Sequence, residues 1–291
     1  MFATLLGALP RPSADPDAID RAQPDDIDRL IEIAVRAQAA AGLEPITDGR
    51  LGSEPFDRLQ TADQVVARWR STQELTDKAV MQALPGPIAL SGGVETVKKL
   101  AQVVNALAEA GCPLVEIEEV ATHRLGTAEE RDAFRDAHDR LVAAVSGTHL
   151  SLSIVGASVD EGAWATILGL PYHSLAVDLI AGPESWNLVT RWAGDRGVVA
   201  GVESGRKDDE PKEVLLWAAH YAASTQGRGR ARVGLGSAGS WAQLPWEAAV
   251  RKMQLLGEAA RLASLPPGED LSRSLDPRAV SPRRAALGHD A

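Results

Sequence analysis

The segment His149-Leu150-Ser151-Leu152-Ser153-Ile154 alternates polar and apolar residues, and this alternation decides the fold class. A period of two is typical of a β-strand whose apolar side chains face one way and whose polar side chains face the other. Glycines bound the segment at Gly147 and Gly156, and helical patterns flank it on both sides. The segment is therefore predicted to be the middle unit of a chain that alternates strands with helices.

Outward from this segment, short apolar runs alternate with amphipathic helical patterns along most of the chain. The predicted strands are 4–9, 45–48, 88–91, 114–118, 149–154, 174–179, 198–202 and 233–236. Between them, residues 51–84 are less regular and are interpreted as an insertion after the second strand. Strands separated by helices run parallel, and eight of them close into a barrel with the helices outside. The alternative is an open doubly wound sheet, but no glycine-rich phosphate-binding fingerprint follows the first strand.

Composition favours one globular domain without a nucleic-acid or membrane partner. The chain is 45% hydrophobic and carries a net charge of −10, which argues against nucleic acid and against anionic membrane surfaces. No run of 18 apolar residues could span a bilayer, and a single cysteine fits a reducing cytoplasm. We predict a single-domain (β/α)8 TIM barrel over residues 1–264 and a flexible tail over 265–291, where Pro, Arg, Ser and Asp dominate.

Candidate site residues follow from one rule of such barrels: active sites are assembled at the carboxyl ends of the strands. Acidic groups inside a barrel are costly unless they are paired, so they are candidates for function. We predict as catalytic Glu118, Glu119, His149 and Asp178. We predict as substrate-binding Arg11, Asp48, Arg50, His123, Ser151, Arg206, Ser237 and Trp241.

Several of these residues have purely structural alternatives. His149 could be a hydrogen-bonded core histidine, and Asp178 could cap the helix that follows it. Arg50 and Arg206 could be ion-pair partners of Glu118 and Asp178, or they could hold a carboxylate or phosphate through a bidentate fork.

The motifs at these strand ends resemble those of the C-terminal catalytic barrel of cobalamin-independent methionine synthase. The resemblance runs from about Phe2 to Leu262. It rests on the segments Thr4–Pro12, Ile46–Arg50, Gly86–Leu90, Ala110–Val120 and Gly201–Arg206. The wider superfamily is similar to uroporphyrinogen decarboxylase, which works without a metal.

The resemblance also implies a zinc site, and several of its ligand positions are changed here. The family holds zinc through a His-x-Cys pair, a Glu and a second Cys, and the metal activates the thiol of homocysteine. The resemblance places these positions at His149 and Ser151, at Asp178, and near Ala238. A serine hydroxyl is a poor zinc ligand and alanine offers none, so the sequence argues against zinc.

A charge reversal suggests a different substrate. The family's acid after strand two corresponds to Arg50, so a pocket for an amino-acid ammonium group has gained a cation. We therefore expect methyl or alkyl transfer, or related metal-free acid/base chemistry, on a small anionic substrate. Folate is left open as a cofactor, as is the oligomeric state. The alternative is a non-catalytic ligand-binding or partner protein derived from the family.

Overall fold

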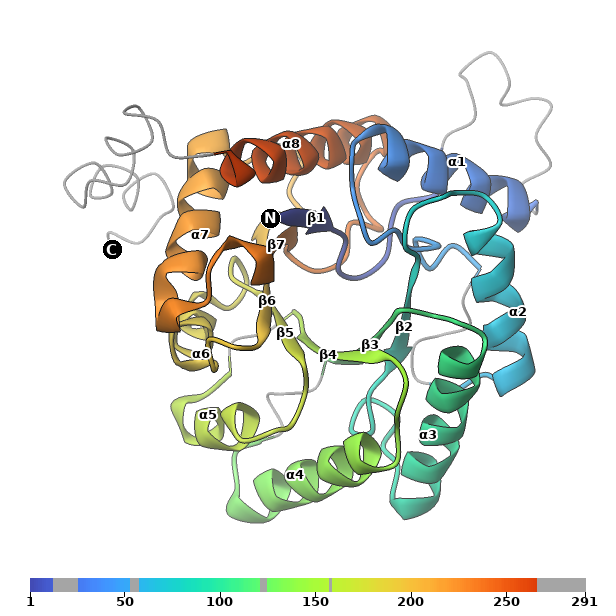
Figure 1. Ribbon diagram of the computed structural model, residues 1–291, viewed down its shortest axis with the longest axis vertical. Helices are drawn as coiled ribbons and strands as arrows, with labels where there is room; N and C mark the ends of the chain where they lie inside the picture. The colour runs from blue at the N-terminus through green and yellow to red at the C-terminus, as the bar shows by residue number, and fades with distance from the viewer. Residues whose placement is uncertain (13–25, 53–57, 121–124, 157–158, 266–291) are drawn as a thin grey trace.

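The computed structural model describes residues 1–12, 26–52, 58–120, 125–156 and 159–265, and its centre is a curled parallel β-sheet surrounded by helices (Figure 1). The sheet has seven strands in the order β1-β7-β6-β5-β4-β3-β2, and every neighbouring pair is parallel. The strands are β1 (Phe2–Thr4), β2 (Met81–Pro85), β3 (Leu114–Glu119), β4 (His149–Ile154), β5 (Ser174–Asp178), β6 (Gly197–Glu203) and β7 (Val233–Ser237).

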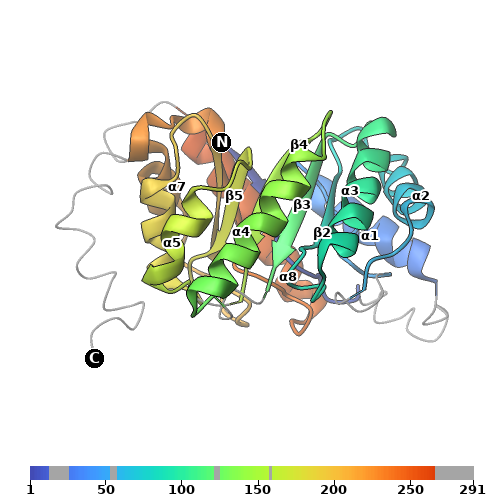
Figure 2. The same ribbon diagram turned by 90° about the horizontal axis from the view of Figure 1, so that it is seen from below.

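Eight α-helices in the described part of the chain cover the outside of the sheet (Figures 1 and 2). They are α1 (Ile27–Ala40), α2 (Ala62–Gln73), α3 (Val94–Glu109), α4 (Ala128–Ala143), α5 (Glu161–Leu168), α6 (Trp186–Arg191), α7 (Lys212–Ser224) and α8 (Trp246–Ser264). Thr127 caps α4 and forms a capping box with Glu130. None of the helices that the structure describes has the length and apolar character needed to cross a membrane.

The expected second strand is reduced to a single bridge, so an eight-stranded barrel is not confirmed. Ile46 pairs with Val80 in an isolated parallel bridge. Glu44 N–H donates to Ala3 O on one side, and Met81 N–H donates to Ile46 O on the other. This short segment therefore lies between β1 and β2 in the place predicted for strand 45–48.

The predicted strand at 88–91 is wrong, and the interpretation of residues 51–84 as an insertion changes with it. The strand is β2, which ends at Pro85, and residues 87–91 form turns. The irregular region instead contributes α2 and β2, which form an ordinary helix–strand unit of the repeat. The proline-rich segment Pro85-Gly86-Pro87 ends the strand because prolines 85 and 87 lack the N–H that a ladder requires.

The sheet separates a large outer core from a small inner one. Side chains on the outer face pack against the helices, whereas Leu6, Val155, Ala176 and Val199 form a separate buried cluster with Phe2 packed against it. Because all the strands are parallel, they finish at one end of the sheet, the carboxyl end, and begin at the other, the amino end.

Candidate functional site

An ion pair between Arg50 and Glu118 lies at the carboxyl end of β3. The guanidinium donates through Nη1 to Glu118 Oε1 at 3.0 Å and through Nη2 to Oε2, which is a bidentate fork. The Glu118 side chain is 3% exposed and the Arg50 side chain is 13% exposed, so the cation lies nearer to solvent. Arg50 adopts the left-handed conformation, with φ of 57°. Asp48 stabilises that turn by accepting the Arg50 backbone N–H at 2.8 Å.

Asp178 ends β5 at the same end of the sheet. Its Oδ1 accepts the backbone N–H groups of Ile180 and Ala181 at 2.9 and 2.8 Å, which fixes the carboxylate. Its Oδ2 faces the loop after β7, where a Cβ added to Gly239 would lie 3.3 Å away. The ion pair between Arg50 and Glu118 that was the structural alternative for Arg50 is present. The alternative pair between Arg206 and Asp178 is not: Arg206 pairs with Glu210.

Glu119 points away from the inside of the sheet, toward α4. Its carboxylate accepts the backbone N–H groups of Ile88 and Ala89, both at 2.9 Å. His138 Nε2 lies 3.1 Å from Glu119 Oε1, and His138 Nδ1 lies 2.7 Å from the Tyr172 hydroxyl. These contacts make Glu119 an anchor for the turn after β2, which differs from the catalytic role predicted for it.

The remaining predicted substrate-binding residues are mostly engaged in structural contacts. Ser237 Oγ accepts the Leu6 N–H and donates to the Leu6 carbonyl. Trp241 is 1% exposed, and its indole N–H donates to Glu203 O at 3.3 Å. Arg206 is largely exposed, as is Arg11 just after β1. The prediction for His123 lies outside the described residues.

His149 and Ser151 lie at the amino end, away from the carboxylates with which they were predicted to cluster. In the register of β3 and β4, His149 is opposite Leu114, whereas Glu118 is opposite Ser153. At about 3.3 Å per residue, four residues separate His149 from the level of Glu118 by roughly 13 Å. The sequence identified the strand and its inward face correctly, but it placed His149 at the wrong end of the strand.

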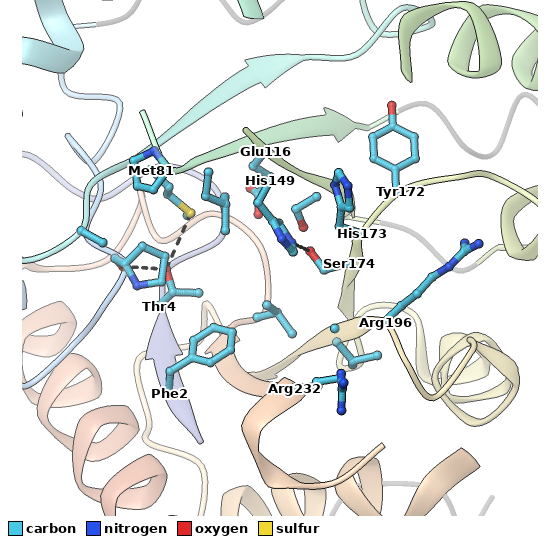
Figure 3. Close-up of a pocket in the computed structure, with 18 of the residues that line it drawn as sticks. Phe2, Thr4, Met81, Glu116, His149, Tyr172, His173, Ser174, Arg196 and Arg232 are labelled. Atoms are coloured by element: carbon cyan, nitrogen blue, oxygen red, sulfur yellow. Dashed lines mark hydrogen bonds between the residues drawn. The ribbon is translucent and has the colours of Figure 1, made fainter. Parts of the chain in front are cut away.

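A cavity of about 780 Å³ opens at this amino end and contains His149 (Figure 3). The imidazole Nε2 lies 2.8 Å from Ser174 Oγ, and the ring packs against His173 with the centroids 5.0 Å apart. Burial and the neighbouring His173 lower the pKa of His149. Phe2 and Met81 contribute apolar walls to the same cavity (Figure 3).

Glu116, which sequence reasoning missed, lines this cavity. It is 2% exposed and lies on the inward face of β3, two residues before Glu118. Burial, and then the charge of Glu118, raise its pKa to about 8, so its carboxyl group is mostly protonated at neutral pH. The sequence could have identified Glu116, because residues two apart on a strand share a face and Glu116 lies two residues before Glu118.

The described residues contain no group of three or more His, Cys, Asp or Glu side chains placed to hold a metal ion. Of the positions that the resemblance assigned to zinc ligands, His149 and Ser151 line the amino-end cavity, whereas Asp178 ends β5 at the carboxyl end. These residues do not fit a shared tetrahedral site.

A family model matches residues 93–213, and its description is cobalamin-independent synthase, N-terminal domain. The motifs had been compared with the C-terminal catalytic barrel of the same family, so the match supports the family through a different domain. No curated protein matches the chain.

Solved structures share the fold at low sequence identity. A B12-independent methionine synthase from Shewanella sp. W3-18-1, solved with selenomethionine, aligns with a TM-score of 0.72 at 13% identity, over 89% of this chain and 96% of that one. The putative B12-independent methionine synthase from Listeria monocytogenes gives 0.69 at 14% identity, over 91% and 98%. A methyltransferase from Methanosarcina mazei gives 0.59 at 13% identity, over 90% and 94%.

These identities establish likeness of fold, and the family model adds a sequence similarity over residues 93–213. Its match covers α3 to the start of α7, including the strands that carry Glu118 and Asp178. The resemblance read from the sequence motifs is thereby confirmed over this segment: residues 93–213 are similar to the cobalamin-independent synthase family.

Proposed function

We propose that the protein is a methyl- or alkyl-transfer enzyme, or one of related acid/base chemistry, that acts on a small anionic substrate at the carboxyl ends of the strands. The observation that carries this proposal is the Arg50–Glu118 fork. Glu118 is almost fully buried while Arg50 is partly exposed, so an anion arriving from solvent meets the cation first. A planar guanidinium suits carboxylates and phosphates.

Asp178 is the proposed proton-accepting or positioning group. Two backbone N–H groups hold its Oδ1, which leaves Oδ2 directed toward the loop after β7. Glu118 lies two strands away in the order β3-β4-β5. Asp178 lies two residues beyond the position level with Glu118. At about 4.8 Å between strands and 3.3 Å per residue, the separation is roughly 12 Å, enough for a small substrate between the two groups.

Zinc-dependent methylation of homocysteine is not part of the proposal. What supports this is the donor set: Ser151 and Ala238 supply no zinc ligand, and His149 and Asp178 belong to opposite ends of the sheet. Elemental analysis of the purified protein tests the point. One zinc per chain, or formation of methionine from homocysteine and 5-methyltetrahydrofolate, would contradict it.

Binding measurements test the anion site directly. Calorimetric titration should detect binding of at least one member of a panel of small anions, such as succinate, citrate and phosphate, and no binding of L-selenomethionine, which occupies the Shewanella relative. Replacing Arg50 by Leu should lower the affinity for the anion at least tenfold, because a charge-assisted bidentate contact is lost. The exposed Arg206→Leu variant is the matched control. Equal loss in both variants, or tight selenomethionine binding by the wild type, would refute the proposal.

The second candidate is a ligand-binding protein without catalysis. It is favoured by the structural engagement of Ser237 and Trp241, whose polar atoms are bonded to Leu6 and Glu203. The two candidates differ in one observable. Substitution of Asp178 by Asn should abolish turnover of an identified substrate while leaving its affinity nearly unchanged if the protein is an enzyme.

A further inference from the structure

The amino-end cavity lies apart from the proposed active site. It is lined by residues from the beginnings of the strands, among them Thr4, Met81, Glu116 and His149 (Figure 3). Val199 of the inner cluster also lines this cavity. The volume of about 780 Å³ is within the range of small-molecule sites in proteins.

Two buried polar groups in this cavity have atoms without a hydrogen-bond partner among the described residues. They are Glu116 Oε1 and Ser151 Oγ, and each residue is 2% exposed. They are directly opposite each other in the register of β3 and β4. Because leaving a buried polar atom unpaired is unfavourable, a ligand that bonds both groups would gain affinity from them.

The other polar groups of the cavity are occupied or point elsewhere. Thr4 donates to Pro45 O at 2.9 Å, and His149 is bonded to Ser174. At the rim, Arg196 donates to Leu170 O at 2.6 Å and packs over Trp192. Its side chain extends away from the centre of the cavity (Figure 3). Arg232, the second arginine of the lining, donates to Arg228 O at 3.4 Å. Both arginines are thus engaged with backbone carbonyl groups.

The charge of the cavity interior selects a neutral ligand. Burial lowers the pKa of His149 and raises that of Glu116, so both are predominantly uncharged at neutral pH. A protonated carboxyl group presents one O–H donor and one C=O acceptor side by side. An amide edge presents the complementary acceptor and donor. The face of His149 and the ring of Phe2 offer surfaces for a planar ring.

We propose that this cavity is a second ligand site, which binds a neutral aromatic molecule carrying an amide-type edge that pairs with Glu116 and Ser151. The site is distinct from the proposed active site, since Arg50, Glu118 and Asp178 do not line the cavity. The charges of Glu118 and Arg50 nevertheless act on Glu116. Its ligand would enter from the side of the strand beginnings.

The probes are benzamide and nicotinamide, with toluene, benzoate and benzylamine as controls, added to the full-length protein and followed by protein-observed NMR. The two amides should shift resonances of residues in β3 and β4, and they should bind at least tenfold more tightly than any control. Preference for a charged control, or no binding of either amide, would overturn the proposal.

Two pairs of variants separate ligand binding from a structural role. Ser151→Ala should lower the affinity for benzamide severalfold. Ser185→Ala, which removes another unpartnered buried hydroxyl outside the cavity, should leave that affinity unchanged. Glu116→Leu should weaken it about tenfold, and Glu116→Gln, which retains a donor and an acceptor, should restore it. Equal affinities in the Ser151 and Ser185 variants, or no loss in Glu116→Leu, would contradict the assignment.

A pH titration gives the sharpest readout. The groups that act on Glu116 are Glu118 on its own strand, Arg50 from the segment before α2 and the Ser153 hydroxyl on β4. His149 lines the same cavity. Benzamide affinity should fall as the pH rises through about 8, where Glu116 loses its proton. The Glu116→Gln variant should show no such fall. A fall of the same size in that variant would assign the titration to another group and refute the role of Glu116.

Discussion

At the scale of single residues, the two-residue alternation of a strand identifies the polar side chains that point to the inside of the sheet. Glu118 was selected because it ends a strand, and the same alternation puts Glu116 on the same face. The alternation could not reveal that Glu119, one residue further, turns outward to bond the N–H groups of Ile88 and Ala89. That contact depends on how the turn after β2 folds, which is long-range information.

The raised pKa of Glu116 makes stability depend on pH. The folded-state pKa of about 8 exceeds the ordinary value of 4.5, so the folded protein binds more protons between these values. The contribution of Glu116 to the free energy of unfolding is complete below pH 4.5 and is lost as the pH rises to about 8. Glutamine has no proton to lose. Urea unfolding should show that Glu116→Gln gains stability over the wild type as the pH rises from 5 to 8. A constant difference between the two would contradict this.

The Arg50–Glu118 pair should show strong thermodynamic coupling. Removing one partner leaves a buried charge, so Arg50→Leu and Glu118→Leu should each cost about 3–5 kcal/mol. The double variant should cost much less than the sum, because neither charge remains. Denaturant unfolding of the four proteins measures this double-mutant cycle. Additive costs would mean that the fork contributes nothing as a pair.

At the scale of elements, helices were predicted more reliably than short strands. The 3.6-residue periodicity extends over many residues, so helical patterns between the strands are readily recognised, and long helices such as α3 and α8 form there. A five-residue strand offers little periodic signal. Apolar residues at 88–91 were taken for the strand, although β2 ends at Pro85. The single bridge at Ile46 could not be predicted, because it depends on pairing with residues far along the chain.

The packing of α1 against α8 depends on a glycine. A Cβ at Gly257 in α8 would lie 1.8 Å from the Ala41 carbonyl oxygen, which is backbone and cannot rotate away. Gly257→Ala should therefore destabilise the protein, despite the higher helix propensity of alanine. Gly162→Ala in α5 is the control, since its nearest neighbour would be an arginine nitrogen at 3.6 Å. This variant should be neutral or stabilising by up to about 1 kcal/mol. Thermal unfolding compares the two, and equal effects would contradict the packing argument.

At the scale of the whole molecule, the sheet is joined unevenly around its circumference. β3 and β4 pair over six residues, whereas Ile46 makes one isolated bridge to the residue before β2. Backbone amides in short ladders open more readily than those in long ones. Hydrogen exchange should therefore be faster at Ile46 and Met81 than at Ile117 and Leu152. Equal protection at these positions would show that the segment at Ile46 is as stable as a full strand.

The amino group of Met1 donates to the hydroxyl of Ser264 at 2.7 Å, so the start of the chain touches the final residue of the last helix. A short linker could therefore join these two points without displacing packed side chains, and the chain could be opened at another place. A circularly permuted gene that fuses these points and starts at an exposed turn should yield a protein with the same topology.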